Sequence, residues 1–129
     1  MATITEDYVS FETAKLLKEK GFDEECVYFY DWDEEDEIYR ICSNGGSCNN
    51  KEYPTYYSRP TLQMAMKWLR EVHNIALNIG WGEILEDKFQ WWCIILNQKD
   101  GSILRESEYY STYEQACEAA IEYCLEHLI

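Results

Sequence analysis

The sequence is poor in positive charge and has no long hydrophobic run. Its 129 residues hold 11 Lys and Arg against 25 Asp and Glu, so the formal net charge is −14 at pH 7. A field of this sign repels a phosphate backbone and an anionic lipid surface, which argues against direct binding to nucleic acid or to a membrane. Basic protein surfaces are the partners that this charge favours.

Two further absences bear on location. No stretch approaches the roughly 18 consecutive apolar residues that a membrane-spanning helix needs. Residues 1–7 carry neither the basic region nor the apolar region of a secretory signal. We therefore expect a cytoplasmic protein whose six cysteines are reduced. Five of them fall in predicted helices or strands, and only Cys48, in a glycine-containing loop, is expected to be exposed.

Motifs for catalysis and for metal binding are also missing. His73 and His127 each end a predicted helix, where a cation interacts favourably with the helix dipole. Asp31–Glu37 is strongly acidic, but a calcium-binding loop would also need a glycine at its sixth position and a glutamate at its twelfth. Cys42 and Cys48 are spaced too widely for half of a zinc site. We expect no catalytic residue, no metal and no cofactor.

The chain does contain an internal repeat. Residues 15–19 (KLLKE) and 67–71 (KWLRE) lie late in two helix-like patterns, and each is followed by two strand-like runs. The repeat predicts an α+β fold in which two helix–strand–strand units share one mainly antiparallel sheet of about five strands, with three helices packed on it. We expect a single domain over 1–129, with a flexible connection over about 43–55 between its two halves.

The first half is expected to begin with a helix over 11–20. Ser10 is suited to the N-cap of this helix, and Gly21 to the position just after its end. Short runs of β-forming residues predict strands over 26–30 and 38–42, with the acidic loop between them.

The second half contains the strongest strand pattern of the chain. Residues 89–96 are apolar on both faces, as is typical of a strand in the middle of a sheet. Asp100-Gly101 predicts a hairpin turn behind it. The elements expected in order are a helix from Pro60 to Asn74, strands over 75–79, 89–96 and 102–106, a loop over 80–88 and a helix behind the capping box Ser111–Glu114.

Several segments resemble a group of small uncharacterised proteins from gut Bacteroidetes and their phages. They are Arg59–Thr61, Lys67–Ile75, the aromatic pair Trp91-Trp92 and Tyr109–Ile121. The resemblance covers roughly residues 55–129, whereas residues 1–50 show no match to the group. It implies a small cytoplasmic α+β protein that is often tied to mobile elements. It implies no activity, cofactor or catalytic residue.

Two sets of residues are candidates for interaction. Trp91 and Trp92 belong to a strand that is apolar on both faces, while three short helices cover little more than one face of a sheet. Either the first helix crosses to the far face, or a second copy of the protein covers it as a homodimer. The other set is a row of glutamates along one face of the last helix: Glu114, Glu118, Glu122 and Glu126. It is either a solvated face or a docking stripe for a basic protein partner.

The sequence favours a small cytoplasmic accessory or protein-interaction protein without enzymatic activity, encoded by a mobile element. The alternative is an acidic mimic of nucleic acid that inhibits a DNA- or RNA-binding protein. An enzyme ranks third, because no nucleophile–base pair or metal-ligand set is apparent.

Overall fold

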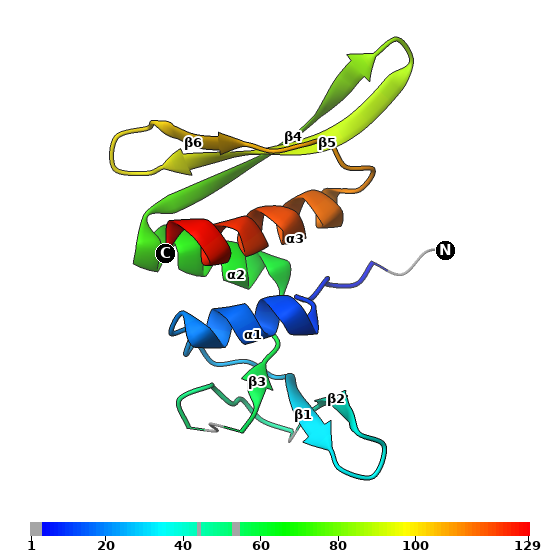
Figure 1. Ribbon diagram of the computed structural model, residues 1–129, viewed down its shortest axis with the longest axis vertical. Coiled ribbons are helices and arrows are strands. Elements are labelled where there is room, and N and C mark those ends of the chain that lie inside the picture. Colours follow the sequence, from blue (N-terminus) through cyan, green and yellow to red (C-terminus); the bar gives the residue numbers. More distant parts are fainter. Residues whose placement is uncertain (1–3, 44, 53–54) are drawn as a thin grey trace. The chain divides into compact units, whose positions relative to one another are not determined.

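The chain folds as α+β with two three-stranded antiparallel sheets (Figure 1). The computed structural model describes residues 4–43, 45–52 and 55–129. These residues form two compact units, Met1–Thr61 (unit 1) and Leu62–Ile129 (unit 2). Each unit contains one of the sheets.

Unit 1 places one helix beside a sheet of strand order β2-β1-β3. The predicted N-cap is confirmed, since the Ser10 hydroxyl accepts a hydrogen bond from the Thr13 amide at 3.3 Å. Gly21 follows the helix with a φ of 90°, as its predicted role requires. The elements are α1 (Phe11–Glu19), β1 (Phe29–Asp33), β2 (Ile38–Cys42) and β3 (Tyr57–Ser58).

The acidic loop is shorter than the sequence indicates. β1 begins three residues later than predicted and continues to Asp33, so only residues 34–37 form the turn. Arg40 donates hydrogen bonds to the carboxylates of Asp33 and Asp36, which lowers the pKa of Asp33. Two of the acids therefore bind Arg40 across the β1–β2 hairpin.

The segment expected to be a flexible connection packs into unit 1 over its residues 45–52. Asn50 is buried; its side chain donates to the Phe22 carbonyl at 2.9 Å and accepts from the Ser58 amide at 2.8 Å. Cys48 pairs with Cys26 through two backbone hydrogen bonds of 2.7 Å. Cys48 is 1% exposed, so the prediction that it is exposed was wrong.

Unit 2 places two helices on one face of a sheet of strand order β4-β5-β6, as Figure 1 shows. Cys93 and Ile95, in the central strand, are fully buried, as are Ala116 and Ile121 in the last helix. The elements are α2 (Leu62–His73), β4 (Ile75–Leu85), β5 (Lys88–Asn97), β6 (Ile103–Glu106), α3 (Tyr113–Tyr123) and a π-helical turn η1 (Cys124–Leu128).

The prediction of one shared sheet of about five strands was wrong. β1 takes its two neighbours, β2 and β3, from unit 1, and β5 takes its two neighbours, β4 and β6, from unit 2. Each central strand is therefore paired on both sides within its own half of the chain. The third strand of the first sheet, β3, is only two residues long and has no strand pattern in the sequence. The single domain over 1–129 stays a prediction.

The last helix begins one residue later than the sequence indicates. Thr112 is the N-cap in place of Ser111, and Gln115 in place of Glu114 completes the capping box with it. Ser111 instead donates its hydroxyl hydrogen to the Gln115 side chain at 2.8 Å. Among the residues with described structure, no helix combines the length and apolar character that crossing a membrane requires.

Candidate functional site

Trp91 and Trp92 lie on opposite faces of the unit 2 sheet. The Trp91 ring is 5.3 Å from the ring of Tyr113 at the start of α3, in an edge-to-face arrangement. The Trp92 ring is 6.1 Å from the ring of Tyr109, also edge to face. Trp91 therefore belongs to the helix-covered face, and Trp92 marks the other face of β5.

Trp92 packs directly over two glycines of the neighbouring strand. A Cβ atom on Gly80 would lie 2.6 Å from the nearest indole atom, and one on Gly82 would lie 3.3 Å away. Gly80 is the register partner of Trp92, so the indole occupies the space above a residue without a side chain. The predicted loop over 80–88 was wrong for this reason: β4 continues through both glycines to Leu85.

The face that carries Trp92 is mainly apolar, with the exposed Asn78 and Glu106 as the register partners of Ile94, and it has no helix of unit 2 packed on it. Alternation along β5 places Ile94 and Leu96 on the Trp92 side, and both are half-buried, unlike Cys93 and Ile95 on the helix side. Ile103 pairs with Leu96 from β6 and is 59% exposed. The residues Trp92, Ile94, Leu96, Ile103 and Tyr109 form what we call the open face.

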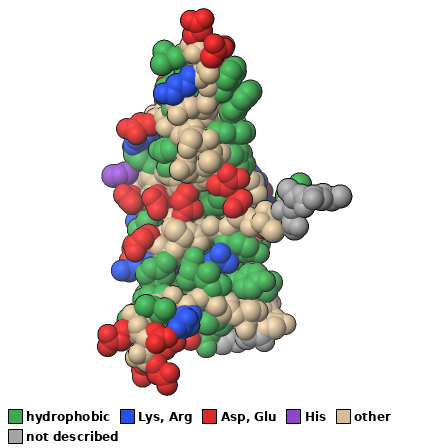
Figure 2. Space-filling view, turned by 90° about the vertical axis from the view of Figure 1, so that its right-hand side faces the viewer, with side chains coloured by type: hydrophobic (Ala, Val, Ile, Leu, Met, Phe, Trp, Pro, Cys, Tyr) green, Lys and Arg blue, Asp and Glu red, His purple; other side chains and the backbone are tan. Residues whose placement is uncertain are grey.

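A second group of aromatic residues lies on the other side of the β4–β5 hairpin. The rings of Trp81 and Phe89 are stacked at 4.9 Å, and Trp81 is 6.3 Å from Trp91. Trp81 is 56% exposed and Phe89 is 48% exposed. Figure 2 shows hydrophobic side chains along this hairpin below the acidic residues of its tip. Exposed apolar surface of this extent is typical of interaction sites.

The sheet of unit 2 is electrically neutral in an otherwise acidic chain. β4 contains one glutamate, β5 one lysine and β6 one arginine and one glutamate. Most acids of unit 2 lie outside the sheet: on the helices, at the tip of the β4–β5 hairpin, where Glu86 and Asp87 are exposed, and in the segments that flank β6. The sheet is thus the part of unit 2 that another acidic molecule can approach with the least repulsion.

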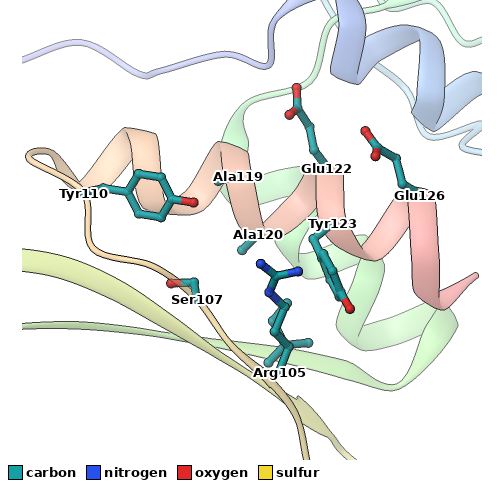
Figure 3. A pocket seen from close by; sticks show the side chains of 9 residues that line it. Arg105, Ser107, Tyr110, Ala119, Ala120, Glu122, Tyr123 and Glu126 are labelled. Atoms are coloured by element: carbon teal, nitrogen blue, oxygen red, sulfur yellow. The ribbon is translucent and has the colours of Figure 1, made fainter.

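The predicted glutamate row lies along α3, apart from the open face. Glu114 and Glu126 are exposed, while Glu118 and Glu122 are half-buried. Glu122 and Glu126 line a cavity of about 190 Å³ between α3 and the chain that follows β5 (Figure 3). Their carboxylates point away from the guanidinium of Arg105 in this view. Trp92, on the sheet face away from α3, therefore does not form one site with the row.

Arg105 is held in this cavity by an aromatic ring. Its guanidinium carbon lies 3.9 Å from the centre of the Tyr123 ring, within the range of a cation–π interaction. Tyr110 lines the same cavity and exchanges backbone hydrogen bonds of 2.7 and 2.8 Å with Trp91. At about 190 Å³ the cavity is smaller than typical small-molecule sites, which measure about 300–1,000 Å³.

Four buried cysteines are unsuited to nucleophilic chemistry. Burial raises the pKa of Cys26, Cys93 and Cys124 to about 12 in each case, and burial also raises the pKa of Cys48. A thiol with so high a pKa is almost entirely protonated at neutral pH and reacts slowly. Across residues 4–43, 45–52 and 55–129, no group of three or more acidic, histidine or cysteine residues is arranged to hold a metal ion.

His73 does not act as the predicted cationic helix cap. Its ring packs edge to face against Trp68 at 4.6 Å, and its Nε2 atom is buried without a hydrogen-bond partner. Burial lowers the pKa of His73, which favours the neutral form. The adjacent Asn74 adopts a left-handed φ of 56° and ends the helix as the sequence predicts.

Comparison of this chain with family models, curated proteins and solved structures finds no match. The surface and its chemistry therefore carry the functional argument. The sequence signal of the open face is a pair of glycines at alternate positions opposite a strand with adjacent tryptophans, although local propensity assigns these glycines to a loop.

Proposed function

We propose that this is a non-enzymatic protein-interaction protein of the cytoplasm, and that it forms a homodimer using the Trp92 side of β5. The open face carries this proposal. It presents Trp92, Ile94 and Leu96 at the centre of a sheet whose other face is already covered by α2 and α3. Apolar sheet faces of this kind are stable in water when another layer packs on them or extends them.

The distribution of charge favours a second copy of this chain as the partner that binds the unit 2 sheet. Two molecules with a net charge of −14 repel each other over most of their surfaces. The unit 2 sheet carries equal numbers of positive and negative residues, so contact through it avoids this repulsion. Three of the five Trp, Trp81, Trp91 and Trp92, lie in this sheet, and Trp is enriched at protein interfaces.

The glutamate row of α3 supports a separate role in binding a basic protein. Glu114 and Glu126 are exposed at opposite ends of the row, and neither α3 nor η1 contains a lysine or arginine. By binding a basic protein through this row, the chain would act as an accessory factor of that protein. The resemblance noted above suggests a mobile element as its source.

An acidic nucleic-acid mimic is the alternative function. A mimic needs carboxylates spaced like phosphates over one continuous surface. Within unit 2 the acids are scattered over α2, α3, η1, both hairpin turns and the end of β6, and the apolar side chains of the sheet interrupt them. This scatter favours the interaction protein over the mimic.

The homodimer can be tested with a charge placed on the open face. Ile103→Asp adds like charges to both copies and is expected to weaken dimerisation about tenfold or more in sedimentation equilibrium. Val72→Asp is the matched control, because Val72 is similarly exposed at 52% but lies on α2. Equal dimerisation by the Ile103→Asp protein and the wild type would contradict the use of this face.

A further inference from the structure

Within the residues that the structure describes, no strand pairs with the outer edge of β4. β4 forms a ladder with β5 only, and its 11 residues make it the longest strand in the described chain. The isolated bridges of the structure lie elsewhere, at Tyr8–Thr61, Cys26–Cys48 and Trp91–Tyr110. β4 is therefore an edge strand with one side open to pairing.

The register shows which backbone groups point outward. Ile75 faces Asn97, and the flanking Gln98 amide donates to the Asn74 carbonyl at 2.8 Å. Ile75 and Asn97 are thus a non-hydrogen-bonded pair, and the hydrogen-bonded positions are the residues of even number in β4. The amides and carbonyls of Leu77, Ile79 and Trp81 consequently point away from β5.

These outward groups have no protein partner in the residues that the structure describes. Apart from the β4–β5 ladder, no hydrogen bond in the described part of the chain involves the main chain of Leu77, Ile79 or Trp81. A row of open donors and acceptors at this spacing is a template for another strand.

The edge also lacks the features that normally prevent pairing. Natural edge strands are usually short, or carry lysine, proline or an early bulge. β4 contains no lysine, arginine or proline, and Glu83 is its one charged residue. Its register irregularity comes late, between Glu83 and Leu85. The edge therefore has the residue composition of a strand that is paired on both sides.

We propose that β4 pairs antiparallel with β4 of a second copy across a two-fold axis at Gly80, which joins two three-stranded sheets into one of six strands. The inference rests only on the self-association proposed above, not on contact through the open face. In this geometry the open faces lie side by side and Ile103, on β6, is outside the contact, so the Ile103→Asp protein should dimerise like the wild type. A two-fold axis perpendicular to the sheet keeps both open faces on the same side, so that they form one continuous apolar surface.

Side-chain chemistry favours Gly80 as the centre of the pairing. Ile79 then lies opposite Trp81 of the partner subunit, twice by symmetry, and such aromatic–β-branched pairs stabilise antiparallel strands. Gly80 meets its own copy at a non-hydrogen-bonded position, where the two Cα atoms approach to about 4.5 Å. Trp92 already covers Gly80, so one indole from each copy flanks the axis on the open face.

Self-pairing fits this edge better than the addition of a foreign peptide does. Two copies of the edge have the same length and the same alternation of side chains between the two faces, and residues 75–82 carry no charge. A foreign peptide would have to supply the same unbroken apolar strand.

Amide hydrogen exchange measured by NMR tests the pairing directly. The amides of Asn78, Gly80 and Gly82 point towards β5 and are internal controls, protected with or without a partner. The amides of Leu77, Ile79 and Trp81 are expected to exchange rapidly in dilute protein and to become protected, about 100-fold, at concentrations where sedimentation shows a dimer.

The outcomes separate this inference from the proposed function. A dimer whose Leu77, Ile79 and Trp81 amides stay unprotected would overturn β4 pairing and leave the homodimer standing. A monomer at every concentration would overturn both. Protection of these amides that does not depend on concentration would show that the chain covers its own edge, and would also overturn the pairing.

A pair of matched variants gives a second readout. Trp81 and Phe89 stack on each other with similar exposure, but only Trp81 lies on the edge strand. Trp81→Lys places a charge opposite Ile79 of the partner subunit, so it is expected to weaken the dimer at least about tenfold more than Phe89→Lys. Equal effects of the two variants would overturn the pairing.

Discussion

Replacement of Gly80 by alanine tests the contact that defines the open face. A Cβ atom at this position would lie 2.6 to 2.8 Å from three atoms of the Trp92 indole. Contacts this short are not tolerated, so either the indole turns away from β4 or the two strands separate. Gly82→Ala is the matched control, because its Cβ atom would meet the same ring at 3.3 Å, which a small shift relieves.

Two opposing contributions set the change in the free energy of unfolding that Gly80→Ala causes. Adding a methyl group to a filled space costs about 1–3 kcal/mol, whereas replacing glycine by alanine stabilises by about 0.4–1 kcal/mol through the unfolded chain. We expect Gly80→Ala to lower the free energy of unfolding by about 1 kcal/mol, and Gly82→Ala to change it by less than about 0.5 kcal/mol. In a Trp92→Ala background the clash is absent, so Gly80→Ala should then raise stability by about 0.5 kcal/mol.

Urea unfolding of the four proteins of this cycle, followed by circular dichroism at one fixed protein concentration, measures these differences. The diagnostic quantity is the change of sign of the Gly80→Ala effect when Trp92 is removed. A Gly80→Ala protein that is equally destabilised with and without the indole would refute the reasoning, because the cost would then arise from the backbone.

The remaining predictions concern side chains outside the open face. Alkylation of the denatured, unreduced protein from its native compartment is expected to modify all six cysteines; an internal disulfide such as Cys26–Cys48 would contradict the proposed cytoplasmic location. In the native protein Cys42, which is half-buried, should be alkylated before the fully buried Cys48. Arg105→Ala should lower stability by about 0.5–1 kcal/mol through loss of the contact with Tyr123, and Arg70→Ala, at an exposed position of α2, should have no measurable effect. The pKa of His73 is lower in the folded protein than in the unfolded chain, so protonation favours unfolding and stability should fall as the pH drops below about 6.5. His73→Gln should remove this dependence between pH 7 and 5.5, and an unchanged slope in that variant would show that another group causes it.

The local elements that the sequence predicted are those with a signal at both ends. α1 lies between Ser10 and Gly21, and the β5–β6 hairpin turns at Asp100-Gly101, where Gly101 has a φ of 75°. In each case the backbone conformation at that position favours the residue type found there, so the sequence alone predicts where the element ends or turns. The central position of β5 was also predicted, because a strand that is apolar on both faces belongs inside a sheet.

The errors arose where a contact between distant residues decides the structure. Gly80 and Gly82 are turn residues by local propensity, but the Trp92 indole across the sheet makes them strand residues. Cys48 follows two glycines and yet is buried, because it pairs with Cys26, 22 residues earlier. The two separate sheets depend on which strand edges meet, and strand patterns carry no information on pairing. For the same reason the unpaired edge of β4 could be recognised only from the register.

Sedimentation equilibrium of the wild-type chain at micromolar concentration is the most direct test of the central claim, that the unit 2 sheet is an interaction surface occupied first by a second copy. The account predicts a species of twice the 15.4 kDa chain mass, dissociating on dilution. A single species of 15.4 kDa throughout the micromolar range would contradict it.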